Sequence, residues 1–195
     1  MNYKKKCGAI AATLPALFLT GCISAPQAQE KLAATTLYDI NRVHNQILKY
    51  KTWKPVNPEP VKLNVLVGAA CANAMKAIST PHADKFVRVY VNDVGLAPML
   101  EAKSPQFPAG TIIVKEKLPN KTSNTPEFFT IMVKRETAYD PDNGDWQYLI
   151  MEPDMAKLEK PSDVENCQSC HATWAKTSDF VSRIYLSPEQ NRKLK

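Results

Sequence analysis

The chain has 195 residues, of which 44% are hydrophobic and 23% charged, and its formal net charge is +6. This length fits one domain with its own core, and the composition excludes both a disordered chain and a bundle of membrane helices. Lys4, Lys5 and Lys6 supply three positive charges in a segment that we expect to be removed, and six less three leaves +3. Such a small, dispersed charge argues against a nucleic-acid partner.

The N-terminus has the pattern of an export signal, which we predict over residues 1–21. A basic region precedes the apolar run CGAIAATLPALFLT, which Pro15 interrupts and which is too short for a comfortable membrane span. The run ends in LTGC, which resembles the lipobox of bacterial lipoproteins, where cleavage precedes a cysteine, here Cys22, that is then acylated. Ile23 follows instead of aspartate, which favours a lipid anchor in the outer membrane, facing the periplasm. A plain secretory signal is the alternative.

The next segments predict a tether, a helix, a loop and a second helix. Residues 22–35 are small and polar, which is typical of a flexible tether, so we expect the domain over 36–195. Apolar residues at helical spacing predict a helix within 36–50. The three prolines of KTWKPVNPEPVK argue against regular structure over 51–62, and LVGAACANAMKAI predicts a helix over 66–78.

The middle of the chain predicts an antiparallel sheet. KFVRVYVN, TIIVKEKL, EFFTIMVKRE and DWQYLIME have the composition of strands, over residues 85–92, 111–118, 127–136 and 145–152. VGLAPMLEAK predicts a short helical connector between the first two strands, and YDPDNGD has the residues of a tight connection between the last two. Another helix is expected after Pro161. Strands with short links and flanking helices predict an α+β fold.

The segment ENCQSCHATW carries the clearest chemical signal. It places Cys167, Cys170 and His171 in the order C-x-x-C-H, the attachment pattern of c-type haem. On a helix these three positions share one face. Two thiols there can form thioethers to the vinyl groups of one haem, and His171 can supply the axial ligand of the iron. We therefore expect one covalent haem c on a C-terminal haem-binding helix, in agreement with the export signal.

A zinc site and a redox dithiol are the competing interpretations of the same cysteines. Structural zinc needs four ligands, and with Cys22 acylated the remaining donors are Cys71, His44 and His82, which have no paired spacing. A redox dithiol is typical of a helix that starts after a strand in a βαβ unit, and no such unit is predicted here. Cys71 has the setting of a small buried hydrophobe.

The sixth coordination position of such a haem decides its function. A strong second ligand makes an electron carrier, whereas an open position makes a gas-binding protein or an enzyme. Each histidine or methionine that could serve as this ligand sits in a loop or an apolar run, where a packing role is the commoner one. These residues are His44, His82, Met75, Met99, Met132, Met151 and Met155.

Five segments in this order resemble the cytochrome P-460 family, which includes the related cytochromes c′-beta. They are YKTW, FVRVYVN, FPAGTIIVKEKL, YDPDNGDWQY and CQSCH, and the resemblance covers about residues 48–186. It implies a compact domain around an antiparallel sheet, a homodimer, and a five-coordinate haem with His171 as proximal ligand. Members of the P-460 type oxidise hydroxylamine and pass electrons to a redox partner cytochrome, whereas c′-beta members bind nitric oxide.

The resemblance also assigns roles to residues around the haem. In P-460 members a lysine is covalently bonded to the macrocycle, and the matching residue is Lys115 in GTIIVKE. By its strand position alone, Lys115 shares a face with Lys117 and would be solvated. Family arginines supply a positive distal group, for which Arg88 is the candidate. The carboxylate of hydroxylamine-oxidising members falls on Thr130, which is no base near neutral pH.

The sequence therefore predicts a periplasm-facing haem protein that oxidises hydroxylamine or handles nitric oxide. Two alternatives stay open: a nitric oxide binding protein without turnover, and a simple electron-transfer cytochrome.

Overall fold

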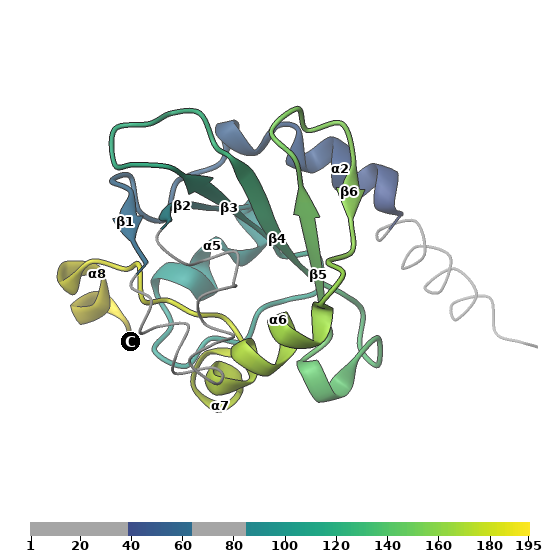
Figure 1. Ribbon diagram of the computed structural model, residues 1–195. Coiled ribbons are helices and arrows are strands. Elements are labelled where there is room, and N and C mark those ends of the chain that lie inside the picture. Colours follow the sequence, from purple (N-terminus) through teal and green to yellow (C-terminus); the bar gives the residue numbers. More distant parts are fainter. Residues whose placement is uncertain (1–38, 64–84) are drawn as a thin grey trace, which may run out of the picture.

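The computed structural model describes residues 39–63 and 85–195 (Figure 1). The signal over 1–21, the tether over 22–35 and the helix expected over 66–78 lie outside the described residues. So do four residues that the sequence singled out, which are Cys22, Cys71, Met75 and His82. In the described part of the chain, no helix has the length and apolar character needed to cross a membrane.

Six antiparallel strands form one sheet in which each strand pairs with the next along the chain. Four of them confirm the predicted strands, and two short edge strands were not predicted. Val61 and Lys62 pair with Val87 and Phe86, so the proline-broken segment ends in a strand. Prolines are tolerated in an edge strand because one side of such a strand has no neighbouring strand and needs no backbone N–H donors. The strands are β1 Val61–Lys62, β2 Phe86–Val91, β3 Ile112–Leu118, β4 Phe128–Lys134, β5 Trp146–Met151 and β6 Leu158–Glu159.

Both faces of the sheet are covered. Because successive side chains of a strand point to opposite faces, they belong to two separate cores. One face of the central strand β3 carries Ile113, Lys115 and Lys117, and the other carries Val114 and Glu116. Every residue of β3 is buried as a result. The expectation of a solvated lysine on this strand was therefore wrong for Lys115, which is 6% exposed, and for Lys117, which is 0% exposed.

The first core lies under the N-terminal segment. Helix α2 (Ile40–Ile47) begins after Asp39, whose carboxylate accepts from the Asn41 backbone N–H at 2.7 Å and caps the helix. The helix is shorter than the predicted one and continues into the 3-10 turn η1 (Tyr50–Thr52). Val43 and Ile47 pack with aromatic side chains in this first core. This side of the sheet carries no cysteine of the motif.

The second core lies between the sheet and the remaining helices (Figure 1). Met99, Val181 and Tyr185 pack there against β2 and β3. The connector predicted between the first two long strands is helical, as expected. The elements on this side are α5 (Asp93–Leu100), α6 (Val164–His171), η3 (Ala172–Trp174), α7 (Ala175–Ser178) and α8 (Pro188–Lys193), and the turn η2 (Pro141–Asn143) joins β4 to β5. The α+β class is thus confirmed.

Candidate haem-binding site

The C-x-x-C-H motif occupies the second half of α6. Asp163 caps this helix by accepting from the Asn166 backbone N–H at 3.2 Å. Cys167 and Cys170 are thiols of intermediate exposure, and His171 is the last residue of the helix. A helix over these residues is what the attachment pattern requires, because it brings the two thiols and the imidazole to one face.

His171 is held with one ring nitrogen engaged. Its Nδ1 lies 2.6 Å from the carbonyl oxygen of Phe180. A carbonyl only accepts, so Nδ1 carries the proton and Nε2 keeps its lone pair. Burial, together with the nearby charge of Lys115, lowers the pKa of His171 to about 3. A neutral imidazole with a free Nε2 is the form that binds iron.

Two aromatic rings fix the plane of the imidazole. The ring of Tyr148 on β5 lies 5.2 Å from the ring of His171 between centroids, and that of Trp174 lies 5.8 Å away. The imidazole itself is 6% exposed. Side-chain rotation at this histidine is therefore restricted before any cofactor binds.

A cavity of about 270 Å³ opens between α6 and the sheet. It lies where the side chains of three strands and one helix converge, and this is the point at which a planar cofactor attached to the thiols would be received. Its wall includes Lys115 from β3, Thr130 and Met132 from β4, Tyr148 from β5, and Cys167 and His171 from α6.

Lys115 enters this cavity as a buried amine. Burial lowers the pKa of Lys115 to about 8, although the nearby thiols of Cys170 and Cys167 act in the opposite direction. Its Nζ lies 5.7 Å from the centroid of the Tyr185 ring. A buried lysine with a lowered pKa has a larger fraction of neutral, nucleophilic amine than a solvated one. Lys117, one step further along the same face, has its pKa lowered by burial and then by the charge of Lys115.

Two buried hydroxyl groups on the cavity wall bear on whether a haem can bind here. Thr130 Oγ1 and Tyr148 OH have no hydrogen-bond partner within the described residues, and both side chains line the cavity. Burial raises the pKa of Tyr148, so its hydroxyl stays protonated. Buried polar atoms need partners, and a cofactor with its ligand or water would supply them. The thiols, the imidazole of His171 and these two unpartnered hydroxyl groups have the chemistry that is suited to holding a haem in this cavity.

Arg88 is not brought together with these residues. It pairs with Glu116 across β2 and β3, on the opposite face from Lys115. Its Nη1 lies 3.4 Å from Glu116 Oε2, and its Nε donates to the carbonyl of Pro58 at 3.2 Å. Glu116, 0% exposed, also accepts from the Tyr50 hydroxyl at 2.6 Å and from Lys51. Arg88 thus belongs to an ionic network around the buried carboxylate of Glu116 in the first core.

Among the described residues that could serve as a sixth ligand, only Met132 lines the cavity. His44 is bonded elsewhere, since its Nε2 lies 2.8 Å from the carbonyl oxygen of Met155. Met99 is packed below Tyr185, whose hydroxyl lies 3.8 Å from the methionine sulfur. Met151 belongs to the opposite core, against which the partly buried Met155 also packs. These positions favour packing roles for all of them except Met132.

Of the extra zinc donors that the sequence offered, His44 lies in the described part of the chain, and its Nε2 contacts the carbonyl of Met155. Over residues 39–63 and 85–195, no three His, Cys, Asp or Glu side chains form a cluster that could hold a metal ion. The cysteines lie away from the helix N-terminus, and burial raises the pKa of Cys167. Redox-active thiols have lowered pKa values instead. The thiol of Cys167 is therefore poorly suited to dithiol exchange.

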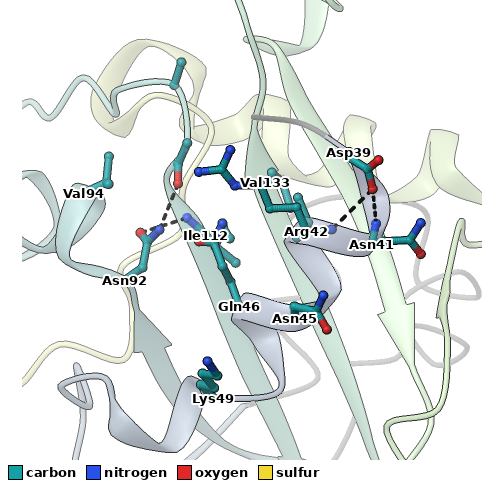
Figure 2. Close-up of a pocket in the computed structure, with 13 residues that line it drawn as sticks. Asp39, Asn41, Arg42, Asn45, Gln46, Lys49, Asn92, Val94, Ile112 and Val133 are labelled. Atoms are coloured by element: carbon teal, nitrogen blue, oxygen red, sulfur yellow. Dashed lines mark hydrogen bonds between the residues drawn. The ribbon is translucent and has the colours of Figure 1, made fainter. Parts of the chain in front are cut away.

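A second, larger groove lies on the other side of the molecule. It measures about 770 Å³ and is bordered by α2, the start of α5 and the sheet (Figure 2). The amide of Asn92 there donates to the Gly110 carbonyl at 2.9 Å and accepts from the Ile112 backbone N–H at 3.0 Å. The described residues that line it include neither cysteine nor histidine. It therefore lacks the residue types that the C-x-x-C-H motif provides for haem attachment.

Three residues of the site were not anticipated from the sequence. Tyr148 could have been found from the alternation of DWQY, which places it on the same face as Trp146. Phe180 and Tyr185 had no signal, because a backbone carbonyl and a core aromatic carry no motif.

A C-x-x-C-H motif on a helix that borders a cavity is typical of a c-type haem protein. The chain belongs to the cytochrome P-460 family, whose model matches residues 49–183. Membership of this family implies a haem cofactor. None of the curated proteins matches the chain.

Proposed function

We propose that this protein attaches one haem covalently through Cys167 and Cys170, with His171 as axial ligand. The observation that carries the proposal is the cavity, whose wall includes Cys167, His171 and the buried amine of Lys115. A bound haem would supply an iron centre that can exchange electrons and bind a small ligand. Lys115 is then the residue that bonds to the macrocycle, as in other members of the P-460 type.

The substrate that we propose is a small nitrogen compound, hydroxylamine or nitric oxide. Oxidation of hydroxylamine requires a group that takes protons from the substrate. Thr130 is not such a group, and the carboxylate on the cavity wall is that of Asp163, one oxygen of which caps α6. Turnover therefore depends on Asp163 or on water. If neither acts, the site is that of a nitric oxide binding protein.

We also propose a cellular location and partners for the protein. We infer that Cys22 carries a lipid anchor and that the domain faces the periplasm, because covalent haem attachment needs an exported chain. The LTGC sequence supports this inference. A redox partner cytochrome would accept the electrons, and a homodimer is the assembly that the family resemblance implies.

Attachment is tested by maturing the full chain in cells that assemble c-type cytochromes. Wild type should show haem-linked peroxidase staining after denaturing electrophoresis, and the double variant Cys167→Ala, Cys170→Ala should show none. Staining in the double variant would refute the attachment. Turnover is tested by incubating wild type with hydroxylamine and an artificial electron acceptor while nitrous oxide and nitrite are measured. Product formation that Asp163→Asn abolishes supports the enzyme, and binding of nitric oxide without any product supports the alternative.

A further inference from the structure

The carbonyl that accepts from His171 belongs to a strained turn. Asp179 and Phe180 both have positive φ, at 49° and 64°, and neither is a glycine. Side chains with a Cβ rarely adopt this left-handed backbone, so two in succession persist only where the surroundings hold them. The Phe180 carbonyl lies at the end of this turn, 2.6 Å from His171 Nδ1.

Asp179 is what holds the turn to the sheet. Its side chain is 7% exposed, and both of its carboxylate oxygens accept from Lys134 Nζ, at 2.8 and 2.7 Å. One of them also accepts from the Phe107 backbone N–H at 2.9 Å. The Asp179 carbonyl accepts from Trp146 Nε1 at 2.8 Å. Charge-assisted hydrogen bonds of this kind, in a buried setting, fix the geometry of the turn.

The connection between β4 and β5 completes the support. Lys134 Nζ donates to the Gly144 carbonyl at 2.8 Å. Gly144 itself has φ of 65°, and a Cβ there would lie 2.4 Å from Cδ2 of the Phe180 ring. The NGDW sequence therefore supplies two contacts to the turn, through the bare glycine and the indole of Trp146. Gln168 of α6 donates to Asp140 at 2.9 Å and joins the same connection to the motif helix.

We propose that Asp179, held by Lys134, is a positioning residue that sets the hydrogen bond from His171 to Phe180 and thereby the donor strength of the axial ligand. The inference rests on the proposed function, in which His171 binds the haem iron. A short bond from Nδ1–H makes Nε2 a stronger donor to iron, and such outer contacts tune the potential of a metal centre. The ion pair thus acts on the iron through one backbone carbonyl.

The test compares holoprotein variants by the iron–histidine stretching band in resonance Raman spectra and by the midpoint potential. Asp179→Asn keeps the shape of the side chain and removes its charge, and Lys134→Met removes the other partner. In both variants the turn should relax and the Nδ1–H bond should weaken. The stretching frequency should fall, and the midpoint potential should rise because ferric iron loses a strong donor. Haem staining should persist in both.

The control is Asn57→Ala, a buried polar change remote from the histidine. Asn57 accepts from the Val89 backbone N–H at 2.9 Å and donates to the Val87 carbonyl at 2.9 Å, so its loss destabilises the fold by another route. An unshifted band in both Asp179→Asn and Lys134→Met overturns the inference, as does an equal shift in Asn57→Ala. If Asp179→Asn does not fold, the band position in Lys134→Met alone decides whether the inference holds. Wild type without an iron–histidine band would refute the proposed function instead.

Discussion

Lys115 on β3 and Thr130 on β4 are cross-strand partners, and both side chains line the cavity that includes His171. The amine is buried because the helices on this side close over the sheet. An amine and a hydroxyl thus stand side by side on the wall opposite the motif helix. This relationship makes Lys115 the residue whose replacement is most informative.

Replacing Lys115 by Leu should convert the spectrum to that of an ordinary five-coordinate haem c. The reason is that a bond from the lysine to the macrocycle disturbs its conjugation and planarity, and distortion is one of the protein's influences on haem. Haem staining should persist, hydroxylamine turnover should fall at least tenfold, which is about 1.4 kcal/mol in the barrier, and nitric oxide should still bind. The measurement is the ferrous absorption spectrum.

The matched control for this change is Lys117→Leu, since Lys117 occupies the same strand face and is equally buried. It should leave the ferrous spectrum unchanged. If Lys115→Leu also has the wild-type spectrum, Lys115 is a buried strand lysine without a bond to the haem, and nitric oxide binding becomes the leading function.

Glu116→Gln should destabilise the fold without altering the haem spectrum. The carboxylate is fully buried and bonded to Tyr50, Lys51 and Arg88 on the face opposite the cavity. Breaking a fully buried pair costs 3–5 kcal/mol in typical cases, and we expect about 2 kcal/mol because Lys51 can turn to water. Urea unfolding measures this loss. A spectral change as large as that of Lys115→Leu would contradict the separation of the two faces.

Lys117→Met should flatten the dependence of stability on pH in the alkaline range. The folded pKa of Lys117 lies well below the usual 10.5, with burial as the main cause. At pH values between the folded and the unfolded pKa of Lys117, the unfolded state binds more protons than the folded state. The free energy of unfolding therefore rises with pH, by at most about 1.4 kcal/mol per pH unit. The unbranched methionine removes this contribution. Urea midpoints between pH 7 and 10 measure the slope.

The control for this slope is Lys121→Met, which changes an exposed lysine. It should keep the wild-type slope. A slope in Lys117→Met that equals the wild-type slope would show that the buried amine does not titrate differently on unfolding.

Cys22→Ser should abolish lipid attachment. Acylation requires the thiol of the cysteine that follows the cleavage site, and serine cannot replace it. The variant should not take up radiolabelled palmitate and should keep its signal segment. Equal labelling of wild type and variant would rule out the lipoprotein interpretation and favour a plain secretory signal.

The sequence by itself was sufficient for the pattern of long strands and for the motif. The composition of four segments predicted β2 to β5 to within two residues at every end, because strand propensity is a local property. The order C-x-x-C-H predicted the helix face on which Cys167, Cys170 and His171 lie, since the spacing of a helix is fixed. The family resemblance followed from the same local segments.

The tertiary structure decided which of these residues meet. Lys115 and Glu116 are neighbours in the chain and alike in polarity, yet one lines the cavity and the other closes an ionic network with Arg88. No local pattern distinguishes the two faces of a strand that is buried on both sides. The Phe180 carbonyl accepts from His171 at a left-handed turn, and Lys134 on the distant strand β4 holds this turn through Asp179. Sequence therefore determines the elements and their chemistry, whereas burial and backbone geometry depend on which elements cover each other.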